Sequence, residues 1–276
     1  MTSEQVVRAS ELISSFKSRI DEPLKTWQGR LRVGVDLGTA NVVVAVVDET
    51  GQPVAGALKP AQVVRDGLVV DYVGAVNIVR RLVENLRATL GAELLTAATA
   101  VPPGTGDRDS RATRYVVESS ELQVVNVVDE PTAASAVLGV RDGAVVDVGG
   151  GTTGISILKE GEVVYTADEP TGGTHFTLVI SGHYGLPFHE AEAMKLDPGR
   201  QPELLPLVRP VMEKVAAIVR RHLQGWDVPT VYLVGGAFSF HGFVEVMERH
   251  LDVPVLCPPE PLLVTPLGIA LCCPAG

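Results

Sequence analysis

The feature that most constrains the fold of this chain is a pattern that occurs twice. Asp36 lies in VGVDLGTANVVVAVVDETGQPV, and Asp147 lies in AVVDVGGGTTGISILKEGEVV. Both segments alternate like a strand, reach an aspartate, turn through glycine and threonine, and continue as two further strands separated by a polar turn. A repeat of this kind predicts two structurally related halves, and a ligand is expected to bind between them.

Composition indicates a folded chain and disfavours two classes of partner. Of the 276 residues, 46% are hydrophobic and 20% are charged, as in a globular protein with a sizeable core. The formal net charge is -10, and because nonspecific nucleic-acid binding needs surplus cations, no nucleic-acid partner is expected. No stretch is long and apolar enough for a membrane span, and residues 1–29 lack the apolar core of a signal peptide. We expect a cytoplasmic protein with no membrane partner.

Strands and helices alternate along the rest of the chain. Helices are predicted where apolar residues recur every three or four positions, and strands where apolar and polar residues alternate. The second half is expected to hold one helical stretch ending at Lys195 and then a Pro-rich connector. The predicted helices are 75–90, 110–122, 131–139, 206–224 and 242–251, and the predicted strands include 97–103, 123–129, 231–236 and 253–256.

Residues 4–20 are predicted to form a separate amphipathic helix at the N-terminus. Their apolar side chains follow helical spacing, and Pro23 and Gly29 then interrupt the pattern. Such a helix either packs on the body of the protein or docks onto a partner protein. The sequence leaves both alternatives open.

The two glycine turns can bind phosphate. A strand that ends in aspartate and turns through glycine presents several backbone N–H groups in a small arc, which holds phosphate oxygens without cationic side chains. Mg²⁺ prefers oxygen ligands and keeps several waters, so Asp36 and Asp147 suit it. Thr39, Thr152 and Thr153 offer hydroxyl donors. The alternative is that the glycines only make tight hairpins, and the duplication of the pattern argues against it.

The second turn also matches the GxGxxG dinucleotide fingerprint through Gly149, Gly151 and Gly154. That fingerprint must lead from a strand into a helix, whose N-terminus meets the pyrophosphate. Residues 155–164 (ISILKEGEVV) instead alternate like a strand and run into a turn. A dinucleotide site is therefore not expected.

Five segments, in this order, resemble the nucleotide-binding segments of the actin and heat-shock-chaperone (DnaK) ATPase superfamily: VGVDLGTAN, VVDEPTAAS, VVDVGGGTTGISI, TGGTHF and VYLVGGA. The resemblance covers about residues 31–272. Further segments, among them VVRDGLVVDYVGAV and AATAVPPGTGDRDSR, are similar to a family of chaperone-like proteins of bacterial ethanolamine utilisation, encoded with microcompartments.

This resemblance implies an α/β, two-lobed actin-like ATPase fold of the ribonuclease H type. The extra subdomain of the second lobe is expected to be reduced or absent, because few residues follow Lys195 before the next helix. The implied domains are an N-terminal amphipathic helix or tail at 1–29, a first lobe of 30–140 plus 262–276, and a second lobe of 141–261.

The resemblance also implies ATP or ADP with Mg²⁺ as cofactors, and it assigns catalytic roles. Asp36 and Asp147 would hold Mg²⁺ through water, and Glu130 would orient or deprotonate the attacking water. The alternative for Glu130 is an acid that favours the helix dipole. Glu192 and Lys195 would contact ribose and adenine, or would form only an i,i+3 surface ion pair. The remaining nucleotide-binding residues would be Gly38, Thr39, Ala40, Asn41, Gly149, Gly150, Gly151, Thr152, Thr153, Gly172, Gly173, Thr174, Gly235 and Gly236.

Departures from the superfamily pattern bear on turnover. Ala40 stands in place of a second threonine, and Gly154 in place of a chaperone aspartate. Neither Lys59 nor Arg65 aligns with the catalytic lysine, and a missing cation at the γ-phosphate weakens hydrolysis more than binding.

Two main functions follow as expectations. One is a chaperone-like, Mg-ATP-binding protein, at most a weak ATP hydrolase, which assists folding, assembly or reactivation of microcompartment or ethanolamine-pathway proteins. The other is a catalytically silent actin-like scaffold or adaptor. A small-molecule kinase is disfavoured by the short chain, and the oligomeric state is left open.

Overall fold

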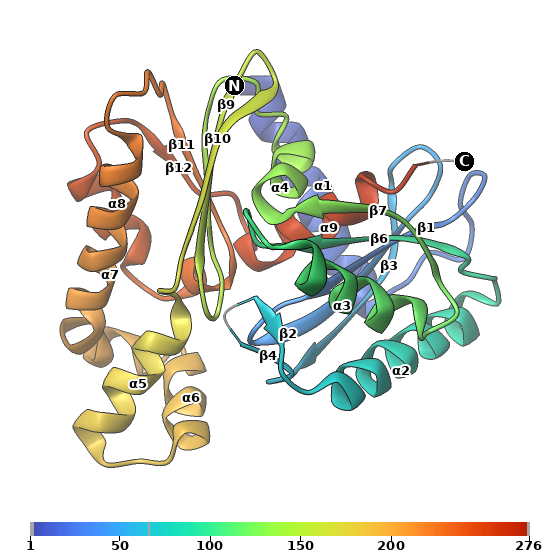
Figure 1. The fold of residues 1–276 in the computed structure, drawn as a ribbon, viewed down its shortest axis with the longest axis horizontal. Helices are drawn as coiled ribbons and strands as arrows, with labels where there is room; N and C mark the ends of the chain where they lie inside the picture. The colour runs from blue at the N-terminus through green and yellow to red at the C-terminus, as the bar shows by residue number, and fades with distance from the viewer. Residues whose placement is uncertain (1–2, 66, 275–276) are drawn as a thin grey trace. The chain divides into compact units, whose positions relative to one another are not determined.

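A computed structural model describes residues 3–65 and 67–274, which form two compact units (Figure 1). Within these residues the first unit runs to Val140 and resumes at Leu263, and the second unit runs from Arg141 to Leu262. Each unit contains a five-stranded sheet, and the described residues add one two-stranded hairpin.

The sheet of the first unit has the strand order β3-β2-β1-β6-β7. β1, β2 and β3 form an antiparallel meander, whereas β6 and β7 run parallel to β1. β2 is buried at every position after Asn41, as expected for a strand covered on both faces. The strands are β1 (Arg32–Leu37), β2 (Asn41–Val47), β3 (Pro53–Pro60), β6 (Thr96–Val101) and β7 (Gln123–Asp129).

Helices cover both faces of this sheet: Figure 1 shows α2 and α3 on one face and α4 and α9 on the other. Gly268 of α9 allows α4 to approach, because a Cβ atom there would lie 1.9 Å from the carbonyl oxygen of Ala133. These elements are α2 (Tyr72–Leu90), α3 (Asp107–Glu118), α4 (Glu130–Leu138), α9 (Val264–Leu271) and the hairpin β4 (Val64–Arg65) and β5 (Leu68–Val69).

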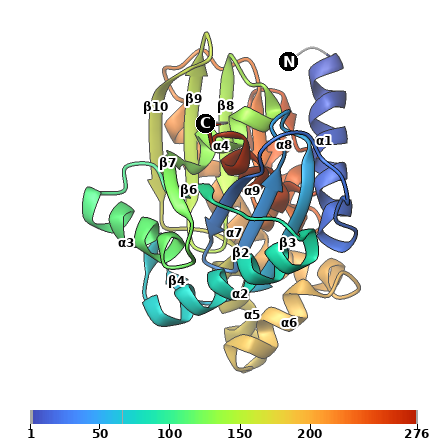
Figure 2. The same cartoon turned by 90° about the vertical axis from the view of Figure 1, so that its right-hand side faces the viewer.

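The N-terminal helix α1 (Ser3–Asp21) packs along β3, at the edge of the first sheet (Figure 2). Ala9, Ile13 and Phe16 are its buried side chains. Gly56 of β3 makes room for Phe16, because a Cβ atom at Gly56 would lie 2.6 Å from Cε2 of the ring. Of the two roles expected for this helix, the structure shows packing on the body of the protein.

The sheet of the second unit has the order β10-β9-β8-β11-β12 and repeats the topology of the first. β8, β9 and β10 form an antiparallel meander, and β11 and β12 run parallel to β8. This shared topology confirms the prediction of two related halves. The strands are β8 (Gly143–Val148), β9 (Thr153–Lys159), β10 (Glu162–Glu169), β11 (Val231–Val234) and β12 (Val255–Leu256).

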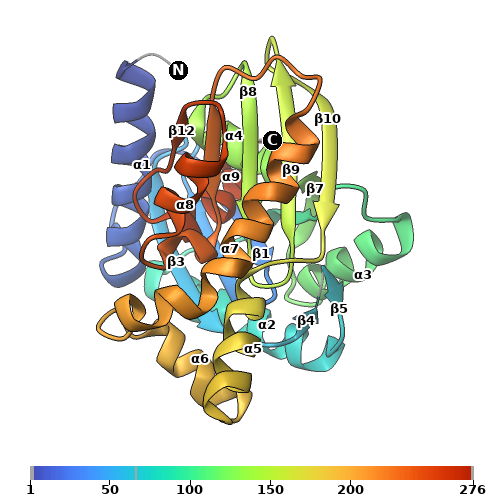
Figure 3. The ribbon, with the colours of Figure 1, turned by 90° about the vertical axis from the view of Figure 1, so that its left-hand side faces the viewer.

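Figure 3 shows α7 and α8 in front of the second sheet, with α5 and α6 beyond one end of it. Phe176 of α5 packs edge-to-face against Phe240 and Phe243, which joins α5 to the loop before α8 and to the first residue of α8. The helical elements are α5 (Gly173–Tyr184), α6 (Phe188–Leu196), α7 (Gln201–Leu223), η1 (Gly236–Ser239), α8 (Phe243–His250) and η2 (Pro261–Leu263).

Several predicted boundaries were wrong. The stretch predicted as one helix to Lys195 is two helices, because Gly185 adopts a left-handed φ of 65° and ends α5. The predicted helix at 110–122 ends at Glu118, since Glu121 takes a φ of 60° that no helix continues.

The predicted Pro-rich connector is largely the start of α7. This helix begins at Gln201, so Pro206 and Pro210 lie inside it and only residues 197–200 separate it from α6. Each proline removes one intrahelical hydrogen bond. Both prolines are exposed, so water can replace the lost bond, while the opposite face of α7 stays buried in the core.

Candidate functional site

The second glycine turn begins beside Asp147, near the end of β8. The strands pair up to Val148 and Thr153, so residues 149–152 form the turn, and the Gly149 N–H donates to the Thr152 carbonyl at 3.0 Å. Asp147 pairs with Val234 in the parallel strand β11, so the residue after β11, Gly235, reaches the same edge of the sheet. The side chain of Asp147 is held at this edge, where Asp147 is only 6% exposed.

Gly235 lies against this turn. A Cβ atom on Gly235 would lie 2.4 Å from Oδ1 of Asp147 and 2.5 Å from the carbonyl oxygen of Val148. Its φ of 98° is also unfavourable for any residue with a side chain. Two of the predicted segments, far apart in the sequence, therefore meet here.

The segment Gly172–Thr174 lies on the same turn. The N–H groups of Gly173 and Thr174 donate to the carbonyl oxygens of Gly149 and Gly150, at 2.9 and 2.7 Å. A Cβ atom on Gly172 would lie 2.7 Å from the Gly149 oxygen. These hydrogen bonds hold the turn rigidly against the first residues of α5.

Lys195 and Glu192 converge on the same place from α6. Nζ of Lys195 lies 2.8 Å from Oε2 of Glu192 and donates to the Gly173 carbonyl at 3.3 Å. Their side chains are 12% and 23% exposed, so the pair is largely buried. A Cβ atom on Gly173 would lie 3.7 Å from Nζ of Lys195 and from Cβ of Ala237, next to Gly236. The i,i+3 ion pair between Glu192 and Lys195 is present, and Lys195 also contacts Gly173 of the predicted site.

Two residues at this place were not predicted from the sequence. The buried hydroxyl of Thr177 donates to the Glu192 carboxylate and lies 3.4 Å from the Gly173 carbonyl. Nδ1 of His175 accepts the Gly172 N–H at 3.2 Å. The sequence signal that could have indicated Thr177 is its spacing. Thr177 follows Gly173 by four residues, so the two lie on the same face of a helix.

In the first unit, Asp36 and Glu130 reach one edge of the sheet. Asp36 lies near the end of β1 and Glu130 directly follows β7, and β1, β6 and β7 are parallel. Asp129 caps α4, accepting from the N–H of Thr132 at 2.9 Å and from its hydroxyl at 2.7 Å. Glu130 therefore lies in the first turn of α4, where a negative charge interacts favourably with the helix dipole. It also lies at the edge of the sheet where the parallel strands have their carboxyl ends.

The first glycine turn occupies the same edge. Leu37 and Val42 are the last residues that pair β1 with β2, so Gly38–Ala40 form the turn and Asn41, the first residue of β2, ends it. A Cβ atom on Gly38 would lie 2.9 Å from the carbonyl oxygen of Asn41, so the turn closes tightly.

The predicted residues therefore gather at one edge in each unit. In the second unit these are Asp147, Gly149, Gly150, Gly151, Thr152, Thr153, Gly172, Gly173, Thr174, Glu192, Lys195, Gly235 and Gly236. In the first unit they are Asp36, Gly38, Thr39, Ala40, Asn41 and Glu130.

A separate chain of polar side chains ties α7 to the edge strand β10. The hydroxyl of Tyr165 lies 2.7 Å from Nδ1 of His222, and Nε2 of His222 lies 2.9 Å from Oε1 of Glu169. The His222 hydrogen bond, with help from Arg221, lowers the pKa of Glu169. This chain contains none of the predicted site residues.

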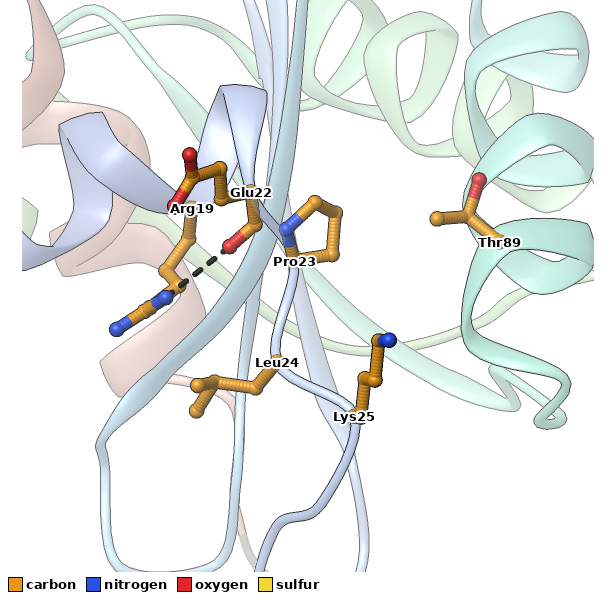
Figure 4. A pocket seen from close by; sticks show the side chains of 6 residues that line it. All are labelled: Arg19, Glu22, Pro23, Leu24, Lys25 and Thr89. Carbon is orange, nitrogen blue, oxygen red and sulfur yellow. Dashed lines mark hydrogen bonds between the residues drawn. The ribbon is translucent and has the colours of Figure 1, made fainter.

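A hollow of about 580 Å³ lies near the end of α1 (Figure 4). On its wall, Nη1 of Arg19 donates to the Glu22 carbonyl at 3.1 Å. No predicted site residue lines it. Its lining consists of Arg19, Glu22, Pro23, Leu24, Lys25 and Thr89.

Among the described residues, neither a directly ligated metal ion nor a membrane-spanning helix is indicated. No three or more His, Cys, Asp or Glu side chains there are grouped to hold a metal ion directly. The expected Mg²⁺ site, with two carboxylates acting through water, is of a different kind. None of the described helices combines the length and apolarity that a bilayer crossing requires.

The chain is similar over nearly its whole length to ethanolamine utilization proteins. The chain is 44% identical to the ethanolamine utilization protein EutJ of Salmonella typhimurium over 265 residues, 95% of this chain and 90% of that protein. The crystal structure of EutJ from Carboxydothermus hydrogenoformans is 48% identical, with a TM-score of 0.91 over 97% of this chain and 99% of that chain.

More distant matches follow. Residues 115–259 match the family model for the type IV pilus assembly protein PilM. A chaperone protein HscA homolog of Pseudomonas paraeruginosa is 33% identical over 50% of this chain and 24% of that protein. The crystal structure of MreB5 of Spiroplasma citri bound to AMPPNP has a TM-score of 0.71 at 16% identity, covering 87% of this chain and 95% of that chain. The fold is that of the actin-like ATPases.

Proposed function

The chain belongs to the EutJ family of ethanolamine utilization proteins, and we propose that it is a chaperone-like protein that binds ATP or ADP with Mg²⁺. It would assist folding, assembly or reactivation of ethanolamine-pathway or microcompartment proteins in the cytoplasm. The observation that carries the nucleotide proposal is the convergence of Asp147, Gly173, Lys195 and Gly235 in the second unit.

The phosphate-binding role rests on the turn at 149–152. Gly172 and Gly235 have no side chains, so other backbone packs directly against this turn and holds it. The N–H groups of Gly173 and Thr174 at the start of α5 donate to carbonyl oxygens of this turn, so α5 holds the turn in place. We expect the phosphates to be bound by the N–H groups of the turn itself, as in other glycine-rich anion sites.

The adenosine-binding role rests on Glu192 and Lys195. A carboxylate accepts hydrogen bonds and an ammonium donates them, so the pair can engage ribose hydroxyls in both senses. Thr177 and the Gly173 carbonyl already orient both groups. Such preorganisation reduces the entropy lost when a ligand binds.

The catalytic part of the proposal concerns three carboxylates. Asp36 and Asp147 would hold Mg²⁺ through water, and the ion would neutralise charge on the phosphates. Glu130 would orient a water molecule by hydrogen bonding. Turnover is proposed to be weak, because Ala40 supplies no hydroxyl to the first turn.

The test is isothermal titration of ATP and ADP into the protein, with and without Mg²⁺. Micromolar, Mg-dependent binding is expected for the wild type, and Asp147→Asn should weaken it at least about tenfold, the effect of losing one charge-assisted contact. Asp227→Asn, at an exposed position of the same unit, is the matched control. Binding that is equally tight in Asp147→Asn would overturn the site assignment.

The second candidate is the catalytically silent scaffold, favoured by Ala40 and by the PilM-type match over residues 115–259. A scaffold would capture its partner equally well with and without nucleotide. Capture of ethanolamine-pathway proteins by the immobilised chain, with Mg-ATP present or absent, separates the two functions. Nucleotide-dependent capture supports the chaperone-like function, and nucleotide-independent capture supports the scaffold.

A further inference from the structure

Gln201 joins two backbone segments through its side-chain amide. It is the first residue of α7 and is only 8% exposed. Its Nε2 donates to the carbonyl oxygen of Lys195 at 3.0 Å, and its Oε1 accepts the backbone N–H of His241 at 2.9 Å. One side chain thus bridges the last turn of α6 and the loop that precedes α8.

The two bridged segments are both attached to the adenosine half of the candidate site. Lys195 is the α6 residue whose ammonium group reaches the Gly173 carbonyl. His241 follows η1, which begins at Gly236 and contains Ala237. Because Lys195 and Ala237 both lie 3.7 Å from the place of a Gly173 Cβ atom, the two segments form two walls around the start of α5.

Glutamine suits this bridge because it has a donor and an acceptor in one amide. The carbonyl of Lys195 belongs to the last turn of α6, where carbonyl groups lack intrahelical partners. Without the amide, the Lys195 carbonyl and the His241 N–H would both lose this hydrogen-bond partner. Because a buried polar group without a partner is unfavourable, both backbone segments would be free to shift.

We propose that Gln201 is a positioning residue for nucleotide binding, which sets the position of Lys195 relative to the Gly236–Ala237 segment. The inference rests on the proposed nucleotide-binding function and adds to it a residue that is not itself one of the predicted ligand contacts. Gln201 acts through Lys195, so its effect on affinity depends on the ammonium group of Lys195.

The fold does not depend on this bridge alone. A Cβ atom on Gly242 would lie 2.9 Å from Cδ2 of Leu205, so α7 and the loop before α8 also meet through close apolar packing. Gln201→Met keeps the length of the side chain and removes both hydrogen bonds. This variant is therefore expected to fold.

The experiment is a double-mutant cycle on Mg-ATP affinity with the wild type, Gln201→Met, Lys195→Met and the double variant, measured by isothermal titration. Gln201→Met should weaken binding about tenfold in the wild-type background, as expected for one or two lost hydrogen bonds. In the Lys195→Met background the same change should have little effect, because the group it positions is gone. A merely structural role would give equal effects in both backgrounds.

Controls keep the outcomes separate. Ser181→Ala removes a different side-chain-to-backbone hydrogen bond, from Ser181 of α5 to the carbonyl oxygen of Leu186 at 2.6 Å, and should leave Mg-ATP affinity unchanged. If Gln201→Met folds poorly, the cycle is run with Gln201→Glu, which keeps the acceptor for His241 and loses the donor for Lys195. Wild-type binding with additive effects overturns the role of Gln201 alone, whereas a wild type that binds no nucleotide overturns the proposed function as well.

Discussion

Gly235 lies so close to Asp147 that a Cβ atom on the glycine would come within 2.4 Å of Oδ1 of the aspartate. The two residues stand at the ends of neighbouring parallel strands, where the pairing of Val234 with Asp147 brings them to one edge of the sheet. Asp147 is buried, and the backbone that lies against its carboxylate carries no side chain. This close approach gives the first prediction.

Gly235→Ala should destabilise the second unit strongly, because the new methyl group meets the Asp147 carboxylate and the Val148 carbonyl. We expect the free energy of unfolding to fall by about 3 kcal/mol or more, from strain and overpacking together. Urea denaturation measures it. Gly225→Ala is the matched control, since Gly225 has a similar φ of 83° with open space around it, and it should lose only about 1 kcal/mol. Equal losses would contradict the close approach.

Thr177→Val should weaken the network around Glu192. The substitution keeps the shape of the side chain but removes the hydroxyl that donates to the Glu192 carboxylate. Stability should fall by about 1–2 kcal/mol, and Mg-ATP affinity should fall with it. Thermal unfolding and isothermal titration measure the two effects. Thr166→Val, at an exposed position of β10, is the control and should change neither stability nor affinity. If Thr177→Val also changed neither, the hydroxyl of Thr177 would not be needed to hold Glu192.

Asp48 should make stability depend on pH. Burial raises the pKa of this carboxyl, but hydrogen bonds from Thr50, Gln28 and Gln52 outweigh burial and lower the pKa below its ordinary value. A lowered folded-state pKa stabilises the fold above the unfolded-state pKa, and this contribution is lost as the pH falls through the folded-state pKa.

Asp48→Asn tests this. Urea denaturation should show a loss of about 1–3 kcal/mol at pH 7, and the difference from the wild type should shrink below about pH 4. Glu49→Gln, at the exposed neighbouring position, should show no such trend. A difference that stays constant with pH would mean that the ionised form of Asp48 carries no stability.

Phe16→Ala should detach α1 from β3. The ring is fully buried against Gly56, and removing such a side chain usually lowers stability by about 3–5 kcal/mol. Hydrogen exchange of the α1 amides should become fast. Val7→Ala, on the exposed side of the same helix, is the control. Fast exchange already in the wild type would instead favour a helix that docks onto a partner.

The sequence by itself determined the elements whose signals are local. The repeated aspartate–glycine–threonine pattern predicted the hairpins β1–β2 and β8–β9, because the two strands and the turn of each hairpin are formed by consecutive residues. The limits of α4 were equally clear, since Pro131 lies in its first turn and Gly139 takes the left-handed conformation that ends it.

Only the tertiary structure decided features that depend on residues far apart in the chain. Prolines at positions 206 and 210 suggested a connector, yet burial of the opposite face keeps α7 helical through both. Likewise, the contacts of Lys195 with Gly173 and of Gln201 with His241 join separate segments. No local sequence pattern predicts these contacts. They form only because the packing of whole helices and strands brings the partner residues within hydrogen-bonding distance of each other.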